Sequence, residues 1–214
     1  MNDQPRDWTR EELEAEYVGH MTVRTVPVNI RIEAKQMILD LSRIRNLLES
    51  ARHIAVEECE CRHRVQGCDG PLDVCLSLND EATDIVDRGH GQMISLSEAL
   101  RVLERSHRAG LVHLAYTLEG SEEIDIICSC CPCCCHSLAA LVRFGYDGHI
   151  IRSDMIASRN DEDCIRCGTC VERCRFGVWE EVNGEVVPDF TKCFGCGVCV
   201  STCQGSAIAL TPRS

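Results

Sequence analysis

The strongest constraint on this sequence is an eleven-residue segment that occurs twice near its C-terminal end. Each copy reads C-x2-C-x2-C-x3-C, and a glycine and a valine inside it are repeated as well. The second copy follows the first at an offset of 29 residues. Three thiolates at this spacing can surround one metal–sulfur group, while the fourth starts a helical turn and points away. The repeat therefore predicts two similar half-domains with these eight thiolate ligands: Cys164, Cys167, Cys170, Cys174, Cys193, Cys196, Cys199 and Cys203.

Residues 159–214 resemble the two-[4Fe–4S] bacterial-type ferredoxin family, on the basis of these cysteine runs. The resemblance implies a small pseudo-symmetric α+β unit in which two hairpins and two helices enclose two clusters. It also implies cross-ligation, in which the last cysteine of each run binds the cluster of the other run. One [4Fe–4S] cluster is then assigned to Cys164, Cys167, Cys170 and Cys203. The other is assigned to Cys193, Cys196, Cys199 and Cys174.

One departure from the family pattern lies directly after the last cysteine of each run. The family has proline there, whereas this chain has Arg175 and Gln204. Arg175 places a positive charge beside one cluster or points to solvent. Two zinc sites are the competing interpretation of the runs, but structural zinc is usually bound by paired C-x2–4-C units.

The preceding region, residues 32–158, contains the other ten of the eighteen cysteines. Six of them fall within eight consecutive positions, which is not a pattern of core packing. In a reducing compartment, grouped thiols indicate metal binding. We therefore predict at least one further metal site among these residues: Cys59, Cys61, Cys68, Cys75, Cys128, Cys130, Cys131, Cys133, Cys134 and Cys135.

The metal in this middle region is left open between iron–sulfur and zinc, because thiolates suit both. Ten cysteines can serve two [4Fe–4S] clusters with two thiols left over. The ferredoxin-type neighbour favours one or two further iron–sulfur clusters over zinc. Arg62 and His63 either donate hydrogen bonds to a cluster or substrate or lie on the surface. His136 either tunes a cluster or begins a helix at the surface.

The order of motifs in residues 54–210 is similar to that of uncharacterised [4Fe–4S]-binding proteins of anaerobes. The motifs are the C-x-C-R pair at Cys59, the V-C-L segment at Cys75, the G-L-V-H segment at Gly110 and the cysteine run from Cys128. This resemblance implies a genuine domain but no substrate.

Regular structure is expected at six places. Apolar spacing predicts a helix over 33–51, and a strand follows at 54–56. A capping box formed by Ser95 and Glu98 predicts a helix over 96–109, followed by a strand over 111–116. A third helix is expected over 137–144, and a strand over 186–189. With an N-terminal arm over 1–31, the fold class is α+β.

Charge and composition limit the partners. The formal net charge of −12 disfavours nucleic-acid binding and suits docking to a basic patch on a redox partner. No secretory signal or membrane span is visible, so we expect a cytoplasmic protein, in an anaerobic setting because exposed clusters are sensitive to oxygen. The oligomeric state is left open.

No dinucleotide-binding, P-loop or flavin motif is visible, so the sequence assigns no catalytic residues. Three functions remain. The first is an electron carrier, or an electron-transfer subunit of an anaerobic oxidoreductase complex. The second is a reductase whose active site is a middle-region cluster. The third is a zinc-bound interaction module joined to a ferredoxin.

Overall fold

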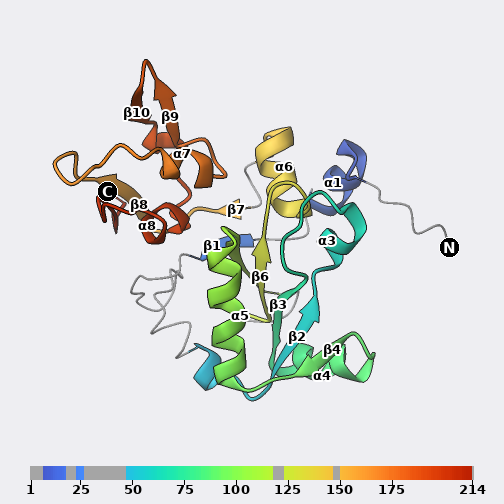
Figure 1. Ribbon diagram of the computed structural model, residues 1–214. Helices are drawn as coiled ribbons and strands as arrows, with labels where there is room; N and C mark the ends of the chain where they lie inside the picture. The colour runs from blue at the N-terminus through green and yellow to red at the C-terminus, as the bar shows by residue number, and fades with distance from the viewer. Residues whose placement is uncertain (1–6, 18–22, 27–46, 118–122, 147–149, 214) are drawn as a thin grey trace.

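The computed structural model describes residues 7–17, 23–26, 47–117, 123–146 and 150–213. Its larger part is a seven-stranded sheet with helices around it, and a smaller C-terminal unit lies beside one end of this sheet (Figure 1). Helices and sheets are both present, so the expected α+β class is confirmed at that level.

The large sheet has the strand order β4-β2-β3-β6-β5-β1-β7. Neighbouring strands are antiparallel, except that β1 and β7 run parallel at one edge. The strands are β1 (Val23–Val26), β2 (Ile54–Glu58), β3 (Asp73–Leu78), β4 (Gly91–Met93), β5 (Val112–Tyr116), β6 (Ile126–Cys130) and β7 (Ile150–Ile151). The central strands β3, β6 and β5 are largely buried.

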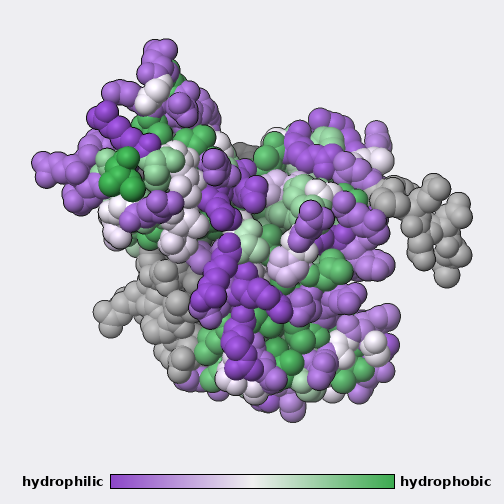
Figure 2. All heavy atoms as spheres, in the orientation of Figure 1, coloured by the Kyte–Doolittle hydropathy of each residue, from purple (hydrophilic) through white to green (hydrophobic). Residues whose placement is uncertain are grey.

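Helix α5 (Leu96–Arg108) covers one face of the sheet. The Ser95 hydroxyl accepts from the Glu98 amide and the Glu98 carboxylate accepts from the Ser95 amide, so the predicted capping box is confirmed. Ala99 and Leu103 face the core, whereas a band of hydrophilic side chains follows the outer side of the helix (Figure 2). Amphipathic spacing therefore fixes how this helix is oriented.

Three other helices lie near the end of the sheet at which β2 and β6 finish (Figure 1). They are α1 (Arg10–Tyr17), α3 (Glu60–Val65) and α6 (His136–Phe144), while α4 (Asn79–Asp87) packs near β4. Helix α6 ends at Gly145, which adopts the left-handed conformation that favours glycine (φ 74°). Helix α1 packs against α6, and the Asp7 carboxylate accepts two hydrogen bonds from the Arg143 guanidinium at 2.6 and 2.9 Å.

The C-terminal unit consists of two two-stranded sheets and short helices. Strand β8 (Met155–Arg159) pairs with β11 (Ile208–Pro212), and β9 (Trp179–Val182) pairs with β10 (Glu185–Pro188). The helices are α7 (Thr169–Arg173), α8 (Val198–Ser201) and the 3-10 turn η1 (Phe190–Lys192). Trp179 is buried and meets Phe190 edge to face, with ring centres 5.5 Å apart.

The two parts share an apolar core. Phe194 and Val198 of the C-terminal unit are buried together with Leu114 and Leu138 of the larger part. A hydrogen bond between the Ser201 hydroxyl and the His107 ring lies near this contact. The two parts are therefore packed against each other and not merely tethered.

Most of the expected elements are present. The strand at 54–56, the helix at 96–109, the strand at 111–116 and the helix at 137–144 are confirmed by β2, α5, β5 and α6. Strand β10 lies where 186–189 was expected. Most of the helix expected over 33–51 lies outside the described residues, although residues 47–50 are helical. Strand β1, within the expected N-terminal arm, is part of the large sheet.

Candidate metal centres

The eight C-terminal cysteines line two pockets. One pocket, here called the inner pocket, is lined by Cys174, Cys193, Cys196 and Cys199. The other, here called the outer pocket, is lined by Cys164, Cys167, Cys170 and Cys203. In each pocket, three cysteines come from one repeat and the fourth from the other.

Backbone amides point at the sulfur atoms of the inner pocket. The Ala157 and Gly195 amides each lie 3.4 Å from the Cys193 Sγ, and the Val178 amide lies 3.4 Å from the Cys174 Sγ. Such N–H donors stabilise thiolates and the anionic clusters that thiolates bind. The donor set and the shape of the pocket therefore fit a [4Fe–4S] cluster.

The two pockets differ in exposure. Cys193 and Cys199 of the inner pocket are buried, and burial raises the pKa of Cys196 to about 12. In the outer pocket Cys167 is exposed, and the neighbouring Ile165 side chain is 60% exposed. The outer pocket therefore lies at the surface, whereas the inner pocket adjoins the shared core.

Arg175 follows Cys174 but reaches toward the larger part of the molecule. One of its terminal nitrogens lies 3.7 Å from the position that a Cβ on Gly110 would take. Its Nε is buried, with no hydrogen-bond partner among the described residues. Of the two alternatives expected from the sequence, a side chain that simply points to solvent is therefore not what the structure shows for Arg175.

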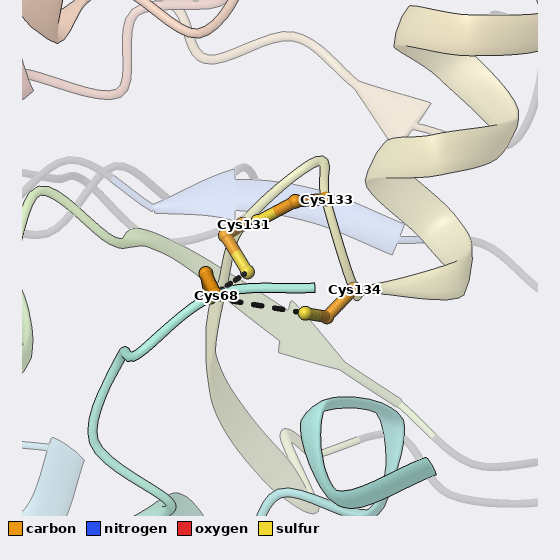
Figure 3. Close-up of side chains that lie close together, drawn as sticks. All are labelled: Cys68, Cys131, Cys133 and Cys134. Atoms are coloured by element: carbon orange, nitrogen blue, oxygen red, sulfur yellow. Dashed lines mark hydrogen bonds between the residues drawn. The ribbon is translucent and has the colours of Figure 1, made fainter. Parts of the chain in front are cut away.

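Four middle-region cysteines form a compact group, here called the four-thiol site: Cys68, Cys131, Cys133 and Cys134. Their sulfur atoms all lie within 4.8 Å of one another, in the loops after α3 and β6 (Figure 3). The Cys68 Sγ lies 3.6 Å from that of Cys131 and 3.8 Å from that of Cys134. A tetrahedral ion with metal–sulfur bonds of about 2.3 Å holds its sulfurs about 3.8 Å apart.

The spacing at the four-thiol site therefore suits one tetrahedral metal ion. In a cubane, each thiolate binds a different iron at a corner, so the sulfurs stand farther apart around a space. The C-terminal pockets have such a space. At this site the sulfur spacing therefore fits a single metal ion better than the [4Fe–4S] cluster that we expected from the sequence.

The N-terminal segment covers the four-thiol site. The Trp8 indole nitrogen donates to the Cys134 carbonyl at 2.7 Å, and the Arg64 guanidinium lies 3.8 Å from the centre of the Trp8 ring. Arg64 also pairs with Glu12 at 3.0 Å. A hydrogen bond, a cation–π contact and an ion pair thus hold this segment in place.

Arg62 lies beneath the same site and is only 2% exposed. Its guanidinium donates to the Ser129 carbonyl at 3.2 Å and to the Cys131 Sγ at 3.6 Å, as well as to the Pro71 carbonyl. Of the alternatives left by the sequence, a donor to a metal-site sulfur therefore fits Arg62. His136 begins α6 and lies 5.6 Å from the Trp8 ring, measured between centres.

The other six middle-region cysteines form a second group, here called the six-thiol ring: Cys59, Cys61, Cys75, Cys128, Cys130 and Cys135. They come from strands β3 and β6, from the residue after β2 and from the starts of α3 and α6. Sequence reasoning placed all ten cysteines in one region without separating the two groups. None of the eighteen cysteines forms a disulfide bond.

Comparison with known proteins identifies one part of the chain. Residues 163–208 match the family model of a 4Fe-4S dicluster domain. A ferredoxin-type domain therefore forms the C-terminal unit, which indicates iron–sulfur electron transfer. No curated protein and no solved structure matches the chain. Among the described residues, no helix is both long enough and apolar enough to cross a membrane.

Proposed function

We propose that this protein carries electrons through two [4Fe–4S] clusters, one in each C-terminal pocket. The observation that carries the proposal is the sharing of cysteines: Cys203 lines the pocket of the first run, and Cys174 lines that of the second. Bound clusters of this kind supply reversible transfer of single electrons. The chain contributes the thiolates that line both pockets and the amide donors of the inner pocket.

The exposure of the two pockets suggests a direction for the transfer. A redox partner can approach the outer pocket, where Ile165 and Cys167 are exposed. Three exposed acidic residues, Asp161, Glu162 and Asp163, precede this loop. We propose that a partner with a basic patch docks here, because opposite charges speed association. The inner cluster would then connect the surface to the middle region.

The Cys203→Ser variant tests the pairing of cysteines with clusters. We expect it to lose or weaken only the outer cluster, although Cys203 belongs to the second run. Iron and sulfide analysis with EPR spectroscopy of the reduced, anaerobically purified protein checks this. The expected result is a fall from about eight irons to about four in the C-terminal unit, with one uncoupled signal remaining.

Cys174→Ser is the matched control and should remove the inner cluster instead. If each serine variant lost the cluster bound by the other three cysteines of its own run, cross-ligation would be wrong. Zinc in place of iron in both pockets would reject the proposed function as a whole.

A second candidate function is favoured by the spacing at the four-thiol site. We propose that this site binds one tetrahedral ion, zinc or iron, that holds the loops after α3 and β6 together. The zinc-bound interaction module considered from the sequence would then be combined with the electron carrier in one chain. A reductase active site in the middle region remains an alternative, with no substrate assigned.

Replacement of the ion at the four-thiol site by cobalt provides a direct check. Tetrahedral thiolate coordination should give intense sulfur-to-cobalt absorption in the near ultraviolet together with d–d bands in the red. Cys133→Ser should reduce both, because one of four thiolates is lost. If anaerobic protein instead held four irons and sulfide in this site, the single-ion assignment would fail.

A further inference from the structure

The six-thiol ring is a group of thiols that neither the dicluster domain nor the four-thiol site uses. We propose that it binds two metal ions, each held by four sulfurs, with two of the six thiolates bridging the ions. This goes beyond the electron transfer proposed for the C-terminal unit.

Strand register explains how the ring is assembled. Leu76 of β3 pairs with Ile127 of β6, so Cys75 and Cys128 lie side by side on one face of the sheet. Cys130 is two residues beyond Cys128 and shares that face, because side chains alternate along a strand. Cys131 falls outside this alternation and joins the four-thiol site instead.

Two helix starts complete the ring. Cys59 follows β2 and is the N-cap of α3, and Cys61 lies in the first turn of that helix. Cys135 is the N-cap of α6. The chain therefore brings together thiols from three neighbouring strands and two helices, separated by as many as 76 residues (Cys59 to Cys135).

Contacts between the thiols close the ring. Each thiol interacts with two others of the group, in the order Cys59, Cys61, Cys135, Cys130, Cys128, Cys75 and back to Cys59. No thiol of the four-thiol site is part of this circuit. The two groups account for all ten cysteines without overlap.

Burial argues that the ring binds a ligand. Cys59, Cys75, Cys130 and Cys135 are each no more than 7% exposed. Thiols gathered in a buried group repel one another when they ionise, and bound cations remove this repulsion.

The number of thiols matches a two-ion centre. Two four-coordinate ions need eight metal–sulfur bonds, and six thiolates supply eight when two of them bridge. A single tetrahedral ion would leave two buried thiols unused. A thiolate-bridged pair of zinc-type or iron-type ions follows.

The ring adjoins the ferredoxin-type domain. Cys128, Cys130 and Cys135 belong to the same apolar core as Phe194 and Cys196, and Cys196 lines the inner pocket. Iron in the ring would therefore lie next to a cluster that can exchange electrons with it. Zinc in the ring would instead brace the contact between the two parts of the molecule.

The wild-type chain provides the first test, which needs no variant. Native mass spectrometry of the anaerobically purified full chain should give the mass of two [4Fe–4S] clusters plus three additional metal ions. Two of these ions are assigned to the ring and one to the four-thiol site. The proposal requires that no sulfide beyond that of the two clusters is present, and elemental analysis then distinguishes zinc from iron.

A pair of serine variants assigns the ions to their sites. Cys61→Ser should lower the additional metal content from three ions to one or two, and the loss should come from the ring. Cys133→Ser is the matched control, because each residue is among the more accessible members of its group. The control should lose one ion and keep the two of the ring. Both variants should retain the EPR signals of the C-terminal clusters.

Two results would overturn the proposal. The first is a wild-type chain with no more than one additional ion. The second is a wild-type chain whose ring holds four or more irons together with sulfide. Because these results come from the wild-type protein, a folding defect in a variant cannot produce them. If the function proposed for the C-terminal unit were wrong, the result would be distinguishable, because the eight irons assigned to its two clusters would be missing.

Discussion

The Gly195→Ala substitution is expected to destabilise the C-terminal unit by about 2–5 kcal/mol and to prevent the inner cluster from binding. Gly195 has a φ of +71°, and a Cβ there would lie 2.7 Å from the Ser153 Oγ and even nearer the Met155 carbonyl oxygen. The Gly195 amide also donates to the Cys193 Sγ. A shift of this loop would therefore displace an amide donor and a wall of the pocket together.

The other repeat supplies a natural control for this prediction. Arg166 occupies the position that corresponds to Gly195 and also has a positive φ, of 56°. The left-handed conformation is thus compatible with a side chain where the loop is exposed. Arg166→Ala should change the free energy of unfolding by less than about 1 kcal/mol and keep both clusters.

Denaturant unfolding and iron analysis of the two variants measure this difference. The outer cluster should persist in Gly195→Ala, because its pocket is lined by other residues. If the two alanine variants lost the same amount of unfolding free energy and of iron, close packing against β8 would not be the reason for glycine at position 195.

The C-terminal unit is largely predictable from sequence because its chemistry is local. Three of the four cysteines in each run lie within seven residues, so their spacing alone indicates a cluster-binding loop. The dicluster match over residues 163–208 confirms a ferredoxin-type domain. The need for glycine at Gly195, by contrast, arises from β8, which the sequence analysis did not place beside this loop.

The middle region is less predictable because its groups depend on tertiary structure. Amphipathic spacing and the capping box give α5, since both are local signals. The division of adjacent cysteines depends on strand alternation and on the register of β3 against β6. Cys130 and Cys131 are neighbours in sequence yet belong to different groups, and no spacing rule separates them. Cys68 joins Cys131 only because the fold brings their loops together.

Arg62 connects these two groups in a way that sequence did not resolve. Its guanidinium contacts the Cys131 thiol of the four-thiol site and interacts electrostatically with Cys59 of the six-thiol ring. Burial lowers the pKa of Arg62, but the interactions with Cys131 and Cys59 outweigh burial and raise it above its ordinary value. A permanent positive charge therefore lies between two sets of cysteine sulfurs. With ions bound as proposed, it would offset negative charge that the ions leave uncompensated, since four thiolates exceed the charge of one divalent ion.

The Arg62→Met substitution is accordingly expected to cost about 3–5 kcal/mol of unfolding free energy, because it removes the buried partner of these thiolates. It also leaves the Ser129 and Pro71 carbonyl oxygens without their donor. We expect the middle-region metal content to fall, while the C-terminal clusters remain. Denaturant unfolding by circular dichroism and metal analysis under anaerobic conditions measure both effects.

Two further variants separate charge from geometry. Arg62→Lys keeps the charge but cannot donate to three acceptors in a planar fork, so its loss of stability should be intermediate. Arg88→Met removes an exposed arginine that pairs with Asp84 at 3.2 Å, and it should cost no more than about 0.5 kcal/mol. If Arg62→Met kept its metal ions and matched Arg88→Met in stability, the guanidinium would not be the counter-charge of the two thiol groups. A large loss in Arg62→Met, an intermediate loss in Arg62→Lys and none in Arg88→Met would instead assign the effect to the buried charge and its hydrogen bonds.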